Sequence, residues 1–218
     1  MLQEAWKNKR DQVEAALKEE LHAGDIADKT LAAAMEYSLM AGGKRLRPVL
    51  LMAAAEAVGG KGEAYLTSAC AIEMIHTYSL IHDDLPAMDN DDYRRGKLTN
   101  HKVYGAGMAT LAGDALLTLA FEVLLRQSGV SDAVKLTVLR EVSEAAGAKG
   151  MVGGQAMDLG AQGQQLNIIT LRRMHMGKTG ALFRAAVRAG AILAGADAAE
   201  LVSLTRYAES FGLAFQIT

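Results

Sequence analysis

The sequence has little of what marks a secreted, nucleic-acid-binding or membrane protein. Its one cysteine, Cys70, among 218 residues excludes an intramolecular disulfide and the usual cysteine zinc sites, and it fits a reducing cytosol. A net charge of −2 gives no overall electrostatic case for binding nucleic acid. The N-terminus shows no basic region followed by an apolar run, and no stretch approaches the roughly 18 uninterrupted apolar residues of a membrane span. We therefore expect a cytoplasmic protein without a membrane span.

Proline and aromatic residues are also scarce, and this scarcity favours helix. The chain has two prolines and 5% aromatic residues, and apolar residues recur at helical spacing with no alternation long enough for a strand. Helices are expected at about 3–21, 28–41, 48–58, 63–84, 106–128, 132–148, 151–162, 170–194 and 197–217. The helices near 63–82 and 106–125 are apolar on most of their surface, so we expect both to be buried centrally. The sequence predicts an all-α bundle with one long charged loop at about 85–104.

An acidic cluster ends the first of these apolar helices. Asp83 and Asp84 follow His82, and Asp89 comes six residues after Asp83. Carboxylates at a helix C-terminus oppose the dipole and need a cation, and oxygen ligands grouped in this way suit Mg²⁺. Pro86 should break the helix and bring Asp89 back towards Asp83. A solvated acidic helix end is the alternative.

Two basic clusters could meet an anion. Residues 42–48 hold two glycines, which allow close backbone approach, and three cations at a joint between helices. The alternative there is an exposed basic turn at a helix end. Arg94 and Arg95 follow the acidic cluster, and paired guanidinium groups beside metal-binding carboxylates suit a polyphosphate. Local charge balance in a flexible loop is the alternative.

Polar residues also interrupt two apolar helices. Glu73 and His76 form a stripe in line with Asp83, and a buried polar stripe needs partners. We expect His76 to face the same cavity as Asp83, although a lone histidine is more often a satisfied core residue. Glycines on both sides of Lys178 predict a kink in its helix, with a lysine that snorkels from the core as the alternative. Residues 153–158, Gly-Gly-Gln-Ala-Met-Asp, are taken as a helix start.

Together these segments resemble the ordered motifs of the trans-isoprenyl diphosphate synthases. The matching residues are 42–48, 75–89, 94–96, 178–180 and 212–216, and the resemblance covers essentially the whole chain. It is closest to the bacterial farnesyl diphosphate synthases. It implies a single polyprenyl synthetase domain over residues 1–218, with an isoprenoid-synthase-type helical bundle around a central cavity, usually as a homodimer. It also implies head-to-tail condensation of isopentenyl diphosphate with dimethylallyl or geranyl diphosphate to give farnesyl diphosphate.

The resemblance assigns a role to each site residue. Asp83 and Asp89 would hold Mg²⁺ on the allylic diphosphate, with Asp84 as a supporting carboxylate. Arg94 and Lys178 would contact the same diphosphate. The residues expected to hold isopentenyl diphosphate are Lys44, Arg47, His76 and Arg95. The oxygens expected to face the developing cation are those of Thr179 and Gln216. The departing diphosphate, rather than a side chain, is expected to be the base.

Product length is expected to depend on Tyr78. In the family, an aromatic residue five positions before the first aspartate, with two extra residues between Asp84 and Asp89, is typical of bacterial enzymes that stop at fifteen carbons. Tyr78 would then be the floor of the prenyl-chain cavity. The alternative is that Tyr78 is ordinary core and another residue limits the chain.

The chain departs from the family at its end. The family's second aspartate-rich motif follows the segment matched by residues 215–217, whereas Thr218 is the last residue here. We therefore expect the C-terminal helices of the fold to be missing and the 218 residues alone to have little synthase activity. Three alternatives stay open: a longer-chain geranylgeranyl-type synthase, a terpene cyclase, and a non-catalytic prenyl-synthase-like subunit. Tyr78 argues against the first, the isopentenyl diphosphate site against the second, and the intact first acidic motif against the third.

Overall fold

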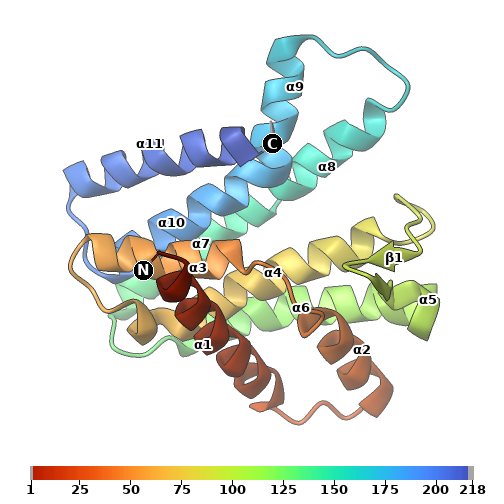
Figure 1. Ribbon diagram of the computed structural model, residues 1–218, viewed down its shortest axis with the longest axis horizontal. Coiled ribbons are helices and arrows are strands. Elements are labelled where there is room, and N and C mark those ends of the chain that lie inside the picture. The colour runs from red at the N-terminus through yellow and green to blue at the C-terminus, as the bar shows by residue number, and fades with distance from the viewer. Residues whose placement is uncertain (1, 216–218) are drawn as a thin grey trace. The chain divides into compact units, whose positions relative to one another are not determined.

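The computed structural model describes residues 2–215, and this part of the chain is almost entirely helical (Figure 1). The α-helices are α1 (Leu2–His22), α2 (Lys29–Leu39), α3 (Leu46–Ala57), α4 (Leu66–Asp83), α5 (Asn100–Tyr104), α6 (Ala106–Arg126), α7 (Asp132–Ala146), α8 (Met151–Gly160), α9 (Ile168–His175), α10 (Ala181–Leu193) and α11 (Ala198–Phe215). A 3₁₀ turn, η1 (Gly62–Tyr65), precedes α4, and a π-helical turn, η2 (Met176–Gly180), joins α9 to α10. The predicted all-α class is confirmed.

Several helices begin at a side-chain cap, as their sequences require. Asp28 accepts a hydrogen bond from the Leu31 amide at 2.7 Å, and Asn167 accepts one from the Thr170 amide at 2.9 Å. Such caps satisfy amides that have no partner within the helix. These bonds fix where α2 and α9 begin.

The chain forms two compact units. The first comprises Met1–Val49 and Leu66–Gln127, and the second comprises Leu50–Tyr65 and Ser128–Thr218. Helix α3 therefore contributes its first turn to one unit and the rest to the other.

Helix α4 is the core of the first unit. It packs against α1, α2 and α6, and this enclosure explains why its sequence is apolar on every side (Figure 1). Cys70, Ile72, Met74 and Ile75 have no exposed surface. Burying each large apolar side chain stabilises the fold by roughly 1.5–3 kcal/mol. The prediction of a buried central helix is confirmed for α4.

The same prediction is wrong for α6. One face of α6 packs against α4, but Leu111 is 54% exposed and Leu125 is 50% exposed. Among the described residues, α6 is also the helix that is long and apolar enough to cross a membrane, with 39% of its most apolar stretch buried. Composition reveals that a helix is apolar all round, but not which neighbour covers each face.

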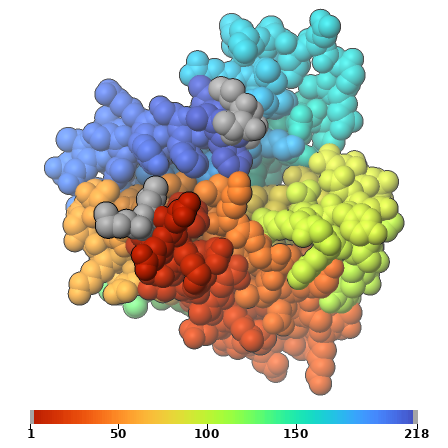
Figure 2. Space-filling model, viewed as in Figure 1, coloured from red at the N-terminus to blue at the C-terminus, as the bar shows by residue number. Residues whose placement is uncertain are grey.

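The segment after α4 is more ordered than the predicted loop. It contains an antiparallel hairpin of β1 (Tyr93–Arg94) and β2 (Lys97–Leu98), followed by α5. Buried Asn100 fastens it to α2, because its amide donates to the Ala34 carbonyl at 2.7 Å and to the Ser38 hydroxyl at 2.8 Å. Figure 2 shows this segment, in yellow-green, at the surface of the first unit.

Small residues allow the helices of the second unit to approach closely. Ala145 of α7 packs with Ala181 and Ala185 of α10. The ring of Phe183 on α10 meets those of Phe211 and Phe215 on α11, each at a centroid distance of 5.2 Å. These contacts hold α10 between α7 and α11.

The single helix predicted over 170–194 is divided. Helix α9 passes through η2 into α10, with Gly177 and Gly180 inside the π-helical turn. The kink expected from these glycines is therefore a π-bulge. Such bulges are frequent at functional sites, and this one carries Lys178 and Thr179.

Candidate functional site

The acidic cluster folds back on itself at the end of α4. The Asp89 amide donates a hydrogen bond to the Asp83 carbonyl at 2.9 Å, and the Met88 amide donates to the Leu85 carbonyl at 2.9 Å. Asn90 adopts a φ of +54°, in the left-handed region, as the turn closes. The predicted return of Asp89 towards Asp83 is therefore confirmed at the level of the backbone.

Asp84 does not share the exposure of its neighbours. It is 3% exposed, and the Nε of Arg94 donates to its two carboxylate oxygens at 2.8 and 2.9 Å. The Nη2 of Arg94 adds a third contact with Asp84 at 2.5 Å. These hydrogen bonds raise the pKa of Arg94. Asp84, expected as a supporting carboxylate, thus holds the Arg94 side chain in place.

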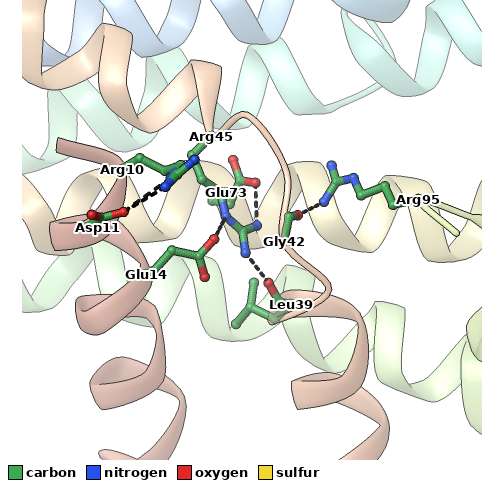
Figure 3. Close-up of polar contacts among 8 residues, drawn as sticks. All are labelled: Arg10, Asp11, Glu14, Leu39, Gly42, Arg45, Glu73 and Arg95. Carbon is green, nitrogen blue, oxygen red and sulfur yellow. Dashed lines mark hydrogen bonds and ion pairs between the residues drawn. The ribbon is translucent and has the colours of Figure 1, made fainter. Parts of the chain in front are cut away.

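Arg95 turns to a different partner. Its Nη1 donates to the Gly42 carbonyl, which lies 53 residues earlier in the chain (Figure 3). A methyl group on Gly43 would lie 2.6 Å from the same nitrogen, and the φ of +133° at Gly43 also disfavours a residue with a side chain. Residues 42–47, here called the basic turn, are thereby joined to the arginine pair.

Arg47, His76 and Arg95 form an electrostatic cluster. Burial, and then the charges of Arg47 and Arg95, lower the pKa of His76 well below 6.5, so this imidazole is neutral at pH 7. Burial also lowers the pKa of Arg47 to about 10, which Glu73 partly opposes and Arg95 reinforces. Lys44 lies exposed on the same turn. Three of the four residues expected to hold isopentenyl diphosphate, Arg47, His76 and Arg95, thus interact with one another in the first unit.

Arg45 departs from the expectation that all three cations of the basic turn could meet an anion. Its side chain has no exposed surface and donates to Glu14 at 2.7 Å and to Glu73 at 2.8 Å (Figure 3). Glu73 thereby receives the partner that its place on an apolar helix requires. Sequence reasoning flagged Glu73, but it did not identify Arg45 as the partner, and it missed Glu14.

A narrow cavity lies beside the arginine pair in the first unit. It is lined by Asp84, Arg94, Arg95, Thr77 and Asn100, together with residues of α2 and β2. Its room for water is about 30 Å³, enough for one or two waters. This cavity is too small to hold a prenyl chain.

The second unit carries Lys178 and Thr179 on the π-helical turn. The Nζ of Lys178 lies 2.5 Å from Asp158 of α8, so residues 153–158 are more than the helix start that we expected. A methyl group on Gly154 would overlap the backbone of Lys178, so this glycine permits the close packing of α8 on η2. Thr179 is buried. Gln216 lies outside the described residues.

Comparison with known proteins identifies a family. The family model described as polyprenyl synthetase matches residues 28–218. The chain is 53% identical over 211 residues to a dimethylallyltranstransferase from Fischerella ambigua, covering 96% of the chain and 60% of that relative. It is 51% identical to a farnesyl diphosphate synthase from Geobacillus stearothermophilus, covering 86% and 64%, and 52% identical to a geranylgeranyl diphosphate synthase from Cyanophora paradoxa, covering 84% and 62%.

Solved structures show the same fold. An FPP/GFPP synthase from Zymomonas mobilis has a TM-score of 0.93 at 42% identity, covering 99% of the chain and 79% of that protein. A geranyltransferase from Legionella pneumophila has a TM-score of 0.94 at 34% identity, covering 98% and 76%. The chain spans less than two thirds of the length of the three curated relatives named above. With its isoprenoid-synthase fold and these matches, the chain belongs to the polyprenyl synthetase family.

Proposed function

We propose that this chain carries the diphosphate-binding sites of a Mg²⁺-dependent prenyltransferase that condenses isopentenyl diphosphate with an allylic diphosphate. The observation that carries the proposal is the divergence of Arg94 and Arg95. One arginine binds Asp84 beside the acidic turn, and the next binds Gly42 in the basic turn. Two neighbouring residues thus couple a carboxylate site to a cationic site. A reaction that joins two diphosphate esters needs such a pair of sites.

The carboxylates fit a magnesium ion that is shared with substrate. Mg²⁺ usually binds through one or two carboxylates together with substrate phosphates, rather than in an all-protein cage. Asp83 and Asp89 supply two carboxylates, and residues 2–215 contain no cluster of three or more acidic, histidine or cysteine groups arranged to hold a metal ion alone. Bound Mg²⁺ would neutralise charge on the leaving diphosphate. We therefore expect metal and allylic diphosphate to bind together.

The cationic site suits the second diphosphate. Arg47 and Arg95 offer guanidinium groups that match phosphate geometry, and Lys44 adds a point charge. Neutral His76 contributes an N–H donor rather than a charge. Lys178 keeps the role toward the allylic diphosphate, and Thr179 the role toward the developing cation, that the resemblance implies.

The reaction then balances without a side-chain base. The allylic carbon–oxygen bond breaks, and the diphosphate takes the electron pair. The double bond of isopentenyl diphosphate attacks the allylic cation and forms the new carbon–carbon bond. The proton that is lost goes to the departing diphosphate. Apolar surroundings protect the cation from water.

Farnesyl diphosphate is the product that we propose. Tyr78 is buried on α4, five residues before Asp83, and its ring meets that of His82 at 5.7 Å. Burial and the charge of Asp83 raise the pKa of Tyr78, which supports their proximity. A bulky ring beside the acidic turn favours an early stop. A geranylgeranyl-type product is the alternative, since relatives of both names match equally well.

A cytoplasmic homodimer is part of the same proposal. Leu111 and Leu125 are exposed on α6, and a second copy that covers them would remove both side chains from water. Cys70 is buried and is a free thiol, which fits a reducing compartment. Light scattering on the purified chain tests the dimer: we expect twice the monomer mass, and a monomer would contradict the proposal.

The test of function separates binding from turnover. Radiolabelled geranyl diphosphate should bind the chain more tightly with Mg²⁺ than without it, and Asp83→Asn and Asp89→Asn should each abolish the metal effect. Asp25→Asn is the matched control, because Asp25 lies exposed in the loop before α2. Diphosphate release with isopentenyl diphosphate added then measures turnover. Metal-independent binding that both substitutions leave intact would refute the proposal.

A further inference from the structure

We infer that Arg45 is a positioning residue whose buried guanidinium, held by Glu14, Glu73 and the Leu39 carbonyl, fixes the basic turn so that Arg47 and Lys44 face the diphosphate of isopentenyl diphosphate. The inference rests on the proposed function for the choice of ligand. Its structural part, that Arg45 orders the turn, stands independently of that choice.

Every nitrogen of the Arg45 guanidinium has a partner on a different helix. Nε donates to Glu14 of α1 at 2.7 Å, Nη1 to Glu73 of α4 at 2.8 Å, and Nη2 to the carbonyl of Leu39, the last residue of α2, at 2.7 Å. Figure 3 shows the side chain pointing inward among these groups. Arg45 directly precedes α3, so one side chain ties the start of α3 to three helices.

The backbone of the basic turn requires such a tie. Gly42, Gly43 and Arg45 have φ values of +81°, +133° and +48°. A non-glycine residue in the left-handed region persists only where surrounding contacts enforce it. Arg45 supplies those contacts from within, and Arg95 holds the Gly42 carbonyl from the opposite side (Figure 3). The basic turn is therefore held on one side by Arg45, which is buried, and on the other by Arg95, which belongs to the cationic site.

Glu73 makes Arg45 necessary for the binding competence of Arg47. Its Oε1 accepts from Arg45, while its Oε2, buried, has no hydrogen-bond partner within residues 2–215. Glu73 also attracts Arg47 electrostatically. If Arg45 is removed, Glu73 is left as a buried carboxylate whose remaining electrostatic partners include Arg47 and Arg95. We then expect Arg47 to be drawn to Glu73 and away from the ligand.

This reasoning gives a rescue that a merely structural role would not produce. Arg45→Met should weaken binding of isopentenyl diphosphate by about tenfold or more, because partners that orient a binding group typically carry effects of this size. The double variant Arg45→Met/Glu73→Gln removes the competing carboxylate as well. It should therefore recover a large part of the lost affinity, although it lacks two charged groups instead of one.

The control is an arginine with a similar ion pair away from the turn. Arg188 of α10 makes a forked pair with Glu141 of α7, so Arg188→Met should lower thermal stability without altering affinity for isopentenyl diphosphate. Geranyl diphosphate with Mg²⁺ serves as a second ligand, whose binding should be unchanged in Arg45→Met. Titration calorimetry measures both ligands on the full chain.

Order in the turn is measured separately by proteolysis. Endoproteinase that cuts after lysine can cleave the bond between residues 44 and 45 in every variant, because Lys44 is retained. We expect cleavage there to be about tenfold faster in Arg45→Met than in the wild type or Arg188→Met, since cleavage reports local opening. Unchanged cleavage, or an equal rise in Arg188→Met, would overturn the inference. Wild-type chain that binds no isopentenyl diphosphate would refute the ligand assignment, while faster cleavage in Arg45→Met would still establish the positioning role.

Discussion

The ion pair between Asp84 and Arg94 should respond very differently to loss of each partner. Asp84 is 3% exposed, whereas a third of the Arg94 side chain, 33%, reaches solvent. Arg94→Met leaves the buried carboxylate of Asp84 without its cationic partner and with little access to water. Asp84→Asn leaves a guanidinium that can turn outward to water. The first substitution should therefore cost more stability than the second.

The contact distances and exposures set the magnitude. Removing one partner of a fully buried ion pair costs about 3–5 kcal/mol, and the partial exposure of Arg94 reduces this to about 2 kcal/mol for Arg94→Met. For Asp84→Asn we expect about 1 kcal/mol, because the amide keeps one acceptor for Arg94. Each kcal/mol lowers the Tm of a protein of this size by about 2–4 °C. The two variants should thus melt roughly 4–8 °C and 2–4 °C below the wild type.

Thermal unfolding followed by circular dichroism measures both variants and their combination. The double variant Asp84→Asn/Arg94→Met leaves no unpaired charge at this site, so it should melt higher than Arg94→Met alone. This increase is the interaction energy that a double-mutant cycle isolates. If Arg94→Met were no more costly than Asp84→Asn, or if the double variant melted lowest, the argument from burial would be wrong.

Three further predictions concern His76, Tyr78 and Gly154. The pKa of His76 is lowered well below 6.5 in the fold, so at acidic pH the unfolded chain binds a proton that the folded chain does not, and stability falls as pH drops below about 6.5. The Tm of His76→Gln should therefore fall less between pH 7 and about pH 5.5 than the Tm of the wild type. An equal fall in Tm in the two proteins would contradict this. Where diphosphate release shows that prenyl transfer takes place, Tyr78→Ala should lengthen the product beyond fifteen carbons in chromatography of prenyl alcohols, and unaltered farnesyl output would reject the floor role. Gly154→Ala should destabilise the chain by about 1–3 kcal/mol because the methyl group overlaps the Lys178 backbone. Gly160→Ala, where nothing lies within 4 Å of the added methyl group, is its matched control and should melt at or above the wild-type temperature.

Helix positions could be predicted because periodicity and breakers act locally. The predicted helix at 63–84 corresponds to η1 and α4, and the one at 132–148 to α7. The interruption of the predicted helix 170–194 by a π-bulge was foreseen only as a kink, since its geometry depends on α8 packing against η2. The exposed face of α6 could not be predicted, because the same composition suits a helix covered on every face and one that is covered on one face only.

The candidate site was predictable in residue type but not in pairing. Pro86 revealed that the chain must turn after α4, and the Asp83–Asp89 backbone bond follows from that turn. Charge alone could not show that Arg94 and Arg95, adjacent in sequence, bind different partners, Asp84 and the Gly42 carbonyl. Arg95 also adopts a φ of +53°, a left-handed conformation that its side-chain type does not indicate.

The buried charges of the first unit explain why Arg45 has a different role from Arg47 and Arg95. A diphosphate site that held only exposed cations would repel itself in the absence of ligand, and its side chains would have to be ordered on binding. Here Glu73 and Glu14 place two negative charges behind the basic turn, and Arg45 offsets them at a fixed position. The remaining cations are thus held near a carboxylate that attracts them but does not neutralise them all. Arg45 offsets the cost of burying Glu73, while Glu73 also attracts Arg47 and Arg95.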